Sequence, residues 1–326
     1  MAAREQVYQA VREAATAAFP ELRGSLRVEP FGSYMTGLGT RTSDIDLVLV
    51  GLAEPSPSLG FYSRDERPRI SRLLDRLNPV LRRSLHPSRL VCIRHSRVPL
   101  TKLTMRDGTS VDISIAGNQG PRAAAYIRQQ VSAFPALRPL VLVVKSYLKA
   151  EGLAEVVSGG LSSYGLTYMV MAHLMEESRR GSDPSDLGAL LHSLLRRFGR
   201  SFDCRLMAVS VRDGGLVPKA SIGGYDHVDH GDRIVTIDPL TGRNCTEGTF
   251  RSAEVLDAFA RADAYLSAWA ARPEADVPSD EDILGPLLVT AEDDEDGEGA
   301  GGEDGAGGGA ALGKRARSAG PGAGGG

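Results

Sequence analysis

The sequence contains few cysteines and no long apolar run. Its three cysteines, Cys92, Cys204 and Cys245, lie far apart and form no C-x-x-C pair, which favours a reducing compartment over a secreted, disulfide-bonded fold. No run reaches the roughly 18 apolar residues that a membrane-spanning helix needs. The N-terminus also lacks the apolar segment of a secretory signal, and its early Glu5 and Glu13 are untypical of a transit peptide.

The charge of the 326-residue chain is unevenly distributed, although its formal net charge is only −3. Residues 274–326 hold 13 acidic and 3 basic side chains, which leaves 28 acidic and 35 basic ones, or +7, in residues 1–273. The basic part permits a polyanionic partner, and its length fits one or two domains. The acidic, glycine-rich end predicts a disordered tail over residues 273–326.

The most informative stretch is residues 31–50, FGSYMTGLGTRTSDIDLVLV. Its final apolar run predicts a buried strand, so Asp44 and Asp46 at the start of that strand share one face. Two carboxylates about 7 Å apart repel each other, and a divalent cation relieves this. Upstream, Gly32 and Ser33 predict a turn whose N–H groups and hydroxyl suit phosphate. An Asp-x-Asp pair alone is more often structural, but together these features indicate a metal-bound nucleoside triphosphate.

A third carboxylate lies on a later predicted strand. Residues 111–115 alternate strictly, with Val111, Ile113 and Ile115 on one face and Asp112 on the other. An isolated aspartate on the polar face of a strand is usually just solvated. Its importance therefore depends on whether this strand lies beside the first pair of carboxylates.

Two lysines interrupt an otherwise apolar helix predicted over Leu137–Ala150. Lys145 and Lys149 are four residues apart and share a helix face. Two aligned ammonium groups suit phosphate oxygens, although lysines at the edge of an apolar helix can also simply reach solvent.

Residues 158–165, SGGLSSYG, precede a predicted apolar helix over residues 166–175. Ser162 or Ser163 is suited to cap that helix. A helix start with free N–H groups, together with the Tyr164 ring, could hold a phosphate and stack on a base. Ordinary capping without a ligand is the alternative.

The remaining segments complete an alternating α/β pattern. The loop at residues 225–230, YDHVDH, has the composition of a metal cluster, but a solvated loop is more typical of its glycine-rich surroundings. Helices are predicted over residues 3–19, 70–84, 122–131, 187–198 and 252–270, strands over residues 26–30, 89–94, 98–104 and 234–237, and a hairpin over residues 209–217.

Together these elements resemble the DNA polymerase β-like nucleotidyltransferases, and among them the non-canonical poly(A) polymerases of the TRAMP RNA-surveillance type. The resemblance covers residues 5–270 and implies an α/β (α+β) fold with two domains. It implies a mixed-sheet catalytic domain over residues 31–120, a mostly helical, PAP-associated central domain over residues 121–272, and an N-terminal helix within residues 1–30 that packs with the central domain. The motifs that carry it are Gly32-Ser33, TSDIDLVLV (42–50), VDISI (111–115), RPLVLVVKSYLKAEGL (138–153), SGGLSSYGL (158–166), RDGG (212–215) and IDPLTGRN (237–244).

The resemblance also implies roles for individual residues. Asp44, Asp46 and Asp112 correspond to the catalytic triad that binds Mg²⁺ or Mn²⁺. The nucleotide-binding residues that it implies are Gly32 and Ser33 for the triphosphate, Lys145 and Lys149 for the phosphates, Ser163 for phosphate or ribose, Tyr164 for stacking on the base, and the recognition loop from Asp238 to Asn244.

The implied reaction is template-independent addition of AMP from ATP to RNA 3′ ends. Asn244 stands where uridylyl-transferring relatives usually carry a histidine, and Ala123 and Ala124 replace an Asn-Thr pair as they do in TRAMP-type polymerases; both features favour ATP. A terminal uridylyltransferase and an inactive nucleotidyltransferase serving as an RNA-binding scaffold remain alternatives. A small-molecule nucleotidyltransferase is disfavoured by the SGGLSSYGL and IDPLTGRN motifs.

RNA binding is implied by the resemblance alone, because the sequence has no zinc-knuckle, RRM or KH signature. A zinc-knuckle RNA-binding protein and an RNA helicase are the implied partners. The small basic cluster of Lys314, Arg315 and Arg317, together with the resemblance, predicts a nuclear location, with the cytoplasm as the alternative. Relatives typically carry a further N-terminal helical segment before the first helix of this chain.

Overall fold

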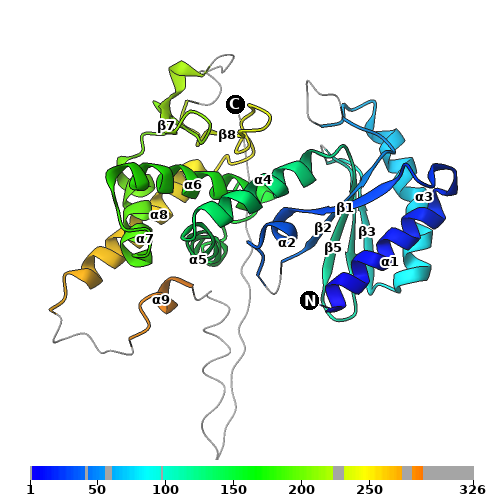
Figure 1. Ribbon diagram of the computed structural model, residues 1–326, viewed down its shortest axis with the longest axis horizontal. Coiled ribbons are helices and arrows are strands. Elements are labelled where there is room, and N and C mark those ends of the chain that lie inside the picture. Colours follow the sequence, from blue (N-terminus) through cyan, green and yellow to red (C-terminus); the bar gives the residue numbers. More distant parts are fainter. Residues whose placement is uncertain are drawn as a thin grey trace, which may run out of the picture. The chain divides into compact units, whose positions relative to one another are not determined.

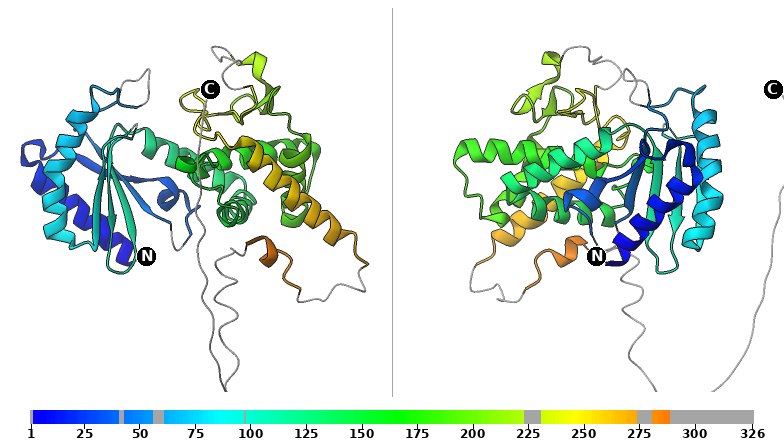
Figure 2. Two further views of the ribbon diagram at one scale, coloured as in Figure 1. Left: turned by 180° about the vertical axis from the view of Figure 1, so that it is seen from behind. Right: turned by 45° about the vertical axis from the view of Figure 1, so that its right-hand side comes forward.

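The computed structural model describes residues 2–40, 43–55, 61–96, 98–222, 231–273 and 281–288 (Figure 1, Figure 2). Residues 225–230, the possible metal cluster of the sequence analysis, lie outside this part of the chain. The same is true of the basic cluster at residues 314–317.

A five-stranded mixed sheet forms the N-terminal half of the fold. Its strands lie in the order β1-β2-β5-β4-β3, and only β2 and β5 pair in parallel. Alternation buries one face of the sheet, where α1 and α3 cover it (Figure 1). The bounds are α1 (Ala2–Ala18), β1 (Arg27–Phe31), α2 (Gly32–Thr36), β2 (Ile45–Val50), α3 (Arg67–Leu85), β3 (Arg89–Ile93), β4 (Leu100–Thr104) and β5 (Ser110–Ile115).

The N-terminal helix α1 packs on this sheet and on α3. Val11, Ala15 and Phe19 are buried in the same hydrophobic cluster as the apolar residues of β2 and β5. The prediction that this helix packs with the central domain is therefore wrong. Its apolar stripe showed which face is buried, but helical periodicity carries no information about the partner.

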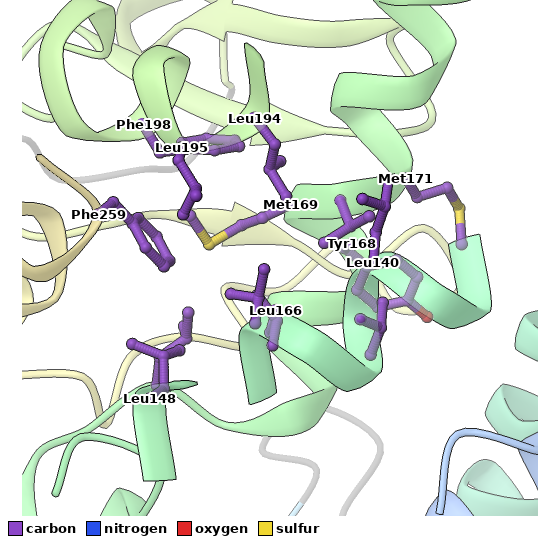
Figure 3. Close-up of a cluster of buried hydrophobic side chains, with 14 of the residues drawn as sticks. Leu140, Leu148, Leu166, Tyr168, Met169, Met171, Leu194, Leu195, Phe198 and Phe259 are labelled. Carbon is purple, nitrogen blue, oxygen red and sulfur yellow. The ribbon is translucent and has the colours of Figure 1, made fainter. Parts of the chain in front are cut away.

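The second half is mostly helical, with a small sheet in the order β7-β6-β8. Helix α6, which is buried from Gly165 to Leu174, lies in its core, where Met169 reaches toward Leu195 and Phe259 (Figure 3). The bounds are α4 (Gln119–Ala133), α5 (Leu137–Ala150), α6 (Ser163–Arg180), α7 (Leu187–Arg196), β6 (Met207–Ser210), β7 (Gly215–Pro218), β8 (Thr236–Ile237), α8 (Ser252–Ala270) and α9 (Gly285–Leu288), with 3-10 turns at Pro20–Leu22, Val156–Ser158 and Lys219–Ser221 and a π-helical turn at Arg197–Ser201.

Residues 281–288 depart from the disordered tail predicted over residues 273–326. Ile283, Leu284 and Leu287 pack against the core of the helical half, and Glu281 accepts a hydrogen bond of 2.6 Å from Arg272. The apolar residues of this short segment cover surface that α5 would otherwise expose, which is why the segment joins the fold.

No single helix in the described part of the chain is long and apolar enough to cross a membrane. Helices α4 and α5 are long and apolar enough for a membrane span only if their residues are counted together. The chain bends by 115° between them.

A buried histidine makes the stability of the helical half depend on pH. His173 of α6 is 1% exposed, its Nε2 lies 3.2 Å from the carbonyl oxygen of Leu190, and its Nδ1 has no hydrogen-bond partner. Burial, assisted by the charge of Arg197, lowers the pKa of His173 from 6.5 to about 4. The folded protein therefore holds the neutral ring, whereas the unfolded chain takes up a proton below pH 6.5.

We expect the free energy of unfolding to fall by about 3 kcal/mol between pH 6.5 and pH 4 because of this one residue. The contribution is fully present above pH 6.5 and is lost as the pH falls toward the pKa of the folded state. Urea titrations of the wild type and His173→Gln across this range measure the difference. A difference in unfolding free energy that stays constant with pH would contradict the prediction.

Candidate functional site

Two of the predicted carboxylates are direct neighbours across the sheet. Asp46 of β2 pairs in register with Asp112 of β5, and adjacent strands are about 4.8 Å apart. Asp44 lies two residues before Asp46, just ahead of β2. The face opposite the buried apolar side chains of β2 and β5 therefore carries all three carboxylates, with Asp46 and Asp112 at one level of the sheet.

A lysine that the sequence analysis did not single out joins this group. Lys102 of β4 is in register with Asp112, and its Nζ lies 2.7 Å from Asp44 Oδ2 and 3.3 Å from Asp112 Oδ1. The strand predicted over residues 98–104 includes Lys102, without a face assigned to this side chain. Only the pairing of β4 with β5 brings it to the carboxylates.

The charges of this group are strongly coupled. Burial, followed by the charges of Asp112 and Asp44, raises the pKa of Asp46 from 3.8 to about 7. Burial also raises the pKa of Asp112 and lowers the pKa of Lys145 on α5, whose ammonium faces Asp46 and Asp44. The site thus holds more negative charge than its environment stabilises, and it would bind an added cation favourably.

The three carboxylates suit a divalent cation, but in the present structure the Lys102 ammonium lies between Asp44 and Asp112. Carboxylate oxygens are the ligands that Mg²⁺ prefers, and buried Asp112 Oδ1 forms no hydrogen bond, although Lys102 Nζ lies 3.3 Å from it. Among the described residues, no three His, Cys, Asp or Glu side chains are grouped so that they could hold one metal ion. The ammonium of Lys102 contacts both Asp44 and Asp112, so a cation shared by these two carboxylates would displace it.

A cavity of about 690 Å³ opens beside Asp46. This volume is typical of ligand-binding pockets. The predicted nucleotide-binding residues that line it are Gly32, Ser33, Lys145, Ser163, Tyr164 and Asp238, and the wall also includes Ala123 and Ala124. These residues come from both halves of the fold, so the tertiary structure brings together most of the predicted site.

Gly32 and Ser33 begin the one-turn helix α2 directly after β1, where the sequence predicted a turn. Gly32 has a φ of +61°, and a Cβ atom built on it would lie 2.1 Å from Asp46 Oδ2. Both the backbone conformation and this close approach require glycine. The peptide of residues 32–33 can therefore lie directly against the carboxylate of Asp46.

The start of α6 settles which serine caps the helix. Ser162 is the N-cap residue, because its hydroxyl accepts a 3.0 Å hydrogen bond from the Gly165 N–H. Ser163 is left to line the cavity. The neighbouring Tyr164 accepts a 2.9 Å hydrogen bond from the Tyr168 hydroxyl, and the two rings pack edge to face at 4.8 Å. Tyr168 thus fixes the position of the Tyr164 ring.

Two predicted nucleotide-binding residues, Lys149 and Asn244, do not line the cavity. Lys149 is exposed near the end of α5. Asn244 Oδ1 accepts hydrogen bonds from the N–H groups of Thr236 and Thr246, at 3.2 and 3.0 Å, and so fixes its own loop. A loop sequence cannot show which side chains fold back onto their own backbone.

Other residues of the same loop reach the cavity in place of Asn244. Leu240, Thr241 and Arg243 line it together with Asp238. The carboxylate of Asp238 accepts hydrogen bonds of 2.8 Å from the Leu240 N–H and from the Thr241 hydroxyl, which ties the loop together. In the sequence, only the position of Leu240, Thr241 and Arg243 within the predicted recognition loop indicated that they could contact the nucleotide.

Two family models match the chain. The model described as "Poly(A) RNA polymerase, mitochondrial-like, central palm domain" matches residues 1–129, and the model described as "Cid1 family poly A polymerase" matches residues 186–244. The first match spans the carboxylates, and the second includes the loop from Asp238 to Asn244.

Curated relatives carry related names. The chain is 34% identical over 202 residues to poly(A) RNA polymerase CID14 of Cryptococcus neoformans, across 60% of this chain and 25% of that protein. It is 32% identical over 276 residues to the Drosophila melanogaster protein named inactive non-canonical poly(A) RNA polymerase protein Trf4-2, across 81% of this chain and 63% of that protein. The chain thus spans less than two thirds of the length of either relative.

Solved structures share the fold. The polymerase core of TRAMP, a RNA surveillance complex, matches with a TM-score of 0.71 and 26% identity over 87% of both chains. Terminal uridylyl transferase 4 of Trypanosoma brucei matches in fold, with a TM-score of 0.65 and 19% identity over 80% of this chain and 92% of that one. These matches confirm the predicted α/β (α+β) nucleotidyltransferase fold. Together, the two family models, the named relatives and the TRAMP core show that the chain carries a poly(A) polymerase-like central palm domain and a PAP-associated domain.

Proposed function

We propose that this chain transfers AMP from ATP to the 3′ end of RNA without a template. The observation that carries the proposal is the row of carboxylates at the edge of a cavity whose other walls provide phosphate-binding groups. Asp46 belongs to both the row and the cavity. A triphosphate in the cavity would therefore bring its phosphates beside the carboxylates.

The proposed roles follow from the positions of the side chains. Lys145 neutralises phosphate charge as it develops, Ser33 donates a hydrogen bond to a phosphate oxygen, and the backbone of Gly32 lies against the triphosphate. The base lies against Tyr164, whose ring Tyr168 holds in place. The RNA 3′-hydroxyl attacks the α-phosphorus, and pyrophosphate leaves. Mg²⁺ or Mn²⁺ held by Asp44, Asp46 and Asp112 would lower the pKa of that hydroxyl and stabilise the leaving pyrophosphate.

The choice of ATP rests on the recognition loop and on the family. Asn244, on which the sequence argument relied, is engaged in the loop scaffold, so base contacts fall to Leu240, Thr241 and Arg243 around it. UTP is the alternative substrate, because a terminal uridylyl transferase shares the fold.

A second candidate function is an inactive nucleotidyltransferase that serves as an RNA-binding scaffold. The Drosophila relative is named inactive, and the Lys102 ammonium contacts two of the three carboxylates. We favour an active nucleotidyltransferase over the scaffold function, because all three carboxylates and the Gly32-Ser33 pair are present beside a cavity of suitable size.

The proposal extends to the cellular setting. Nuclear RNA processing or surveillance is the proposed context, with a zinc-knuckle RNA-binding protein and an RNA helicase as partners. The name of the TRAMP polymerase core, whose fold this chain shares, supports this setting.

Primer extension tests the proposed function. The full chain, a labelled RNA primer and Mg²⁺ or Mn²⁺ are incubated with each ribonucleotide alone and with all four together, and Asp44→Ala serves as the blank. We expect AMP to be added, with kcat/KM for ATP at least about tenfold above that for UTP, equivalent to about 1.4 kcal/mol. Chelation of the metal should stop the reaction.

The other outcomes discriminate among the alternatives. Preferential addition of UMP would identify a uridylyltransferase with the same site. Addition only in the presence of a zinc-knuckle protein would assign RNA capture to that partner. No addition under any of these conditions, with RNA binding retained, would favour the scaffold function.

A further inference from the structure

The row of charged residues at the site continues to the edge of the sheet. Lys102 of β4 pairs in register with Val91 of β3, so Asp46, Asp112, Lys102 and Val91 lie at one level across four adjacent strands. With about 4.8 Å between strands, Val91 lies roughly 10 Å beyond Asp112. β3 is the edge strand, and nothing in the described sheet extends past it.

The open face of β3 presents apolar side chains that the core does not use. Leu90 and Cys92 point toward the buried cluster, whereas Arg89, Val91 and Ile93 point to the other face, which also carries Lys102. Val91 is 37% exposed and Ile93 is 40% exposed. Exposed β-branched residues on an open sheet face suit a partner with flat apolar groups.

The segment that contains α3 and β3 is strongly basic, and Arg89 of β3 lies on the open face. Residues 61–96 contain nine arginines and three acidic residues, a net charge of +6, compared with +7 for residues 1–273. Where α3 meets the end of β3, Arg64, Arg72 and Arg94 line a hollow of about 580 Å³. Asp75 is the acidic residue in that hollow, and Arg94 pairs with it in bidentate fashion at 2.7 and 2.5 Å. Arg64, Arg72 and Arg89 make no ion pair with any described residue.

The position of the cavity indicates from which side of the carboxylates the acceptor hydroxyl approaches. Gly32 and Ser33, which directly follow β1, line the cavity on the β1 side of the carboxylates. In phosphoryl transfer, the attacking and leaving oxygens lie roughly in line on opposite sides of the phosphorus. A triphosphate held on the β1 side therefore requires the attacking hydroxyl to approach from the side of β5, β4 and β3.

We propose that the acceptor RNA lies as a single strand across the open face of β4 and β3. Its phosphates lie near Lys102 and Arg89, and its bases lie against Val91 and Ile93. This inference rests on the proposed function for the identity of the acceptor, and it adds a binding surface outside the nucleotide cavity. Phosphate contacts supply affinity without sequence preference, and apolar contacts with bases are likewise tolerant of sequence.

The first test is a double substitution, Val91→Asp with Ile93→Asp, which places negative charge on the proposed surface. Both positions are exposed, so the buried core is unchanged. Binding of the full chain to a fluorescent oligo(A) with a 3′-deoxy end is measured by anisotropy. We expect at least tenfold weaker binding and an unchanged KM for ATP. The matched control is Leu206→Asp with Val157→Asp, two exposed apolar residues of the other half, 65% and 96% exposed.

The second test measures how RNA binding depends on salt. Each phosphate contact to single-stranded RNA contributes about 0.7 to the slope of log K against log salt concentration. Arg89→Gln should lower that slope by about 0.7, whereas Arg12→Gln, an exposed change on α1, should leave it unchanged. A slope equal to that of the wild type in Arg89→Gln would overturn the assignment of this surface.

These measurements separate the inference from the proposed function. If the wild type binds oligo(A) through these residues but extends no primer, the RNA surface stands and the proposed transfer reaction fails. If the wild type extends primers and the double variant keeps the KM for RNA of the wild type, the reaction stands and this surface is wrong. Equal loss of binding in the double variant and its control would also overturn it.

Discussion

Replacing Asp46 by asparagine is expected to lower nucleotidyl transfer at least about a thousandfold and, at the same time, to make the protein more stable. Asp46 is the residue shared by the row of carboxylates and the cavity. Asparagine keeps the shape of the side chain but removes one of the two anionic oxygens that a divalent cation and the reacting phosphate need. The loss should therefore appear in kcat rather than in the folding of the chain.

The gain in stability follows from the pKa of Asp46. Burial and the neighbouring Asp112 and Asp44 raise that pKa to about 7, so the folded state holds a proton that the unfolded chain loses near pH 3.8. Ionisation of Asp46 therefore destabilises the wild type as the pH rises from about 4 to 7. The asparagine variant does not carry this charge, and at pH 8 it should be more stable by on the order of 2 kcal/mol.

Single-turnover primer extension and urea unfolding at pH 5 and pH 8 measure both effects. Asp257→Asn is the matched control, because Asp257 is exposed on α8 and far along the chain from the site. It should change neither the rate nor the stability. Turnover of Asp46→Asn within tenfold of the wild type would refute the assignment of Asp46, and a stability gain that is the same at both pH values would refute the electrostatic explanation.

Replacing Gly32 by alanine is expected to lower the rate about a hundredfold or more, although the change adds a single methyl group. The new Cβ atom would lie 2.1 Å from Asp46 Oδ2 and 2.9 Å from Asp46 Cγ. The carboxylate must therefore rotate away from its place beside Asp112. The φ of +61° adds a backbone penalty of about 1 kcal/mol for alanine.

Gly37→Ala separates these two effects. Gly37 ends α2 with a φ of +76°, but a Cβ atom there would meet nothing within 4 Å. Both variants should lose about 1 kcal/mol of stability, and only Gly32→Ala should lose activity. Rates and urea midpoints of the two variants provide the comparison. Similar rates in the two variants would show that the contact between Gly32 and Asp46 does not matter for the reaction.

Local patterns in the sequence were enough to predict most secondary elements. Helices α5 and α8 begin and end at the predicted residues, and the hairpin of β6 and β7 extends slightly beyond the predicted residues 209–217 at both ends. The alternation of residues 111–115 placed Asp112 opposite the buried side chains, as the structure has it. These features depend on periods of two or 3.6 residues, which a short window of sequence contains.

The site depended on contacts between residues that are far apart in the chain. Pairing of β2 with β5 sets Asp46 beside Asp112, and pairing of β4 with β5 brings Lys102 to Asp44. Strand order and register are set by the packing of whole elements, and a shift of one residue would turn each side chain to the other face. No local pattern contains that information.

The sequence by itself determined the family, the buried faces of the elements and the candidate carboxylates, because each of these is written in short motifs and periodic patterns. The tertiary structure alone decided that α1 covers the five-stranded sheet, that Lys102 bridges two carboxylates, and that Asn244 supports its loop instead of lining the cavity. The physical reason is the same in all three cases. A side chain's partner is chosen by the free energy of packing and hydrogen bonding over the whole fold, and its own neighbours in sequence fix only which way it can point.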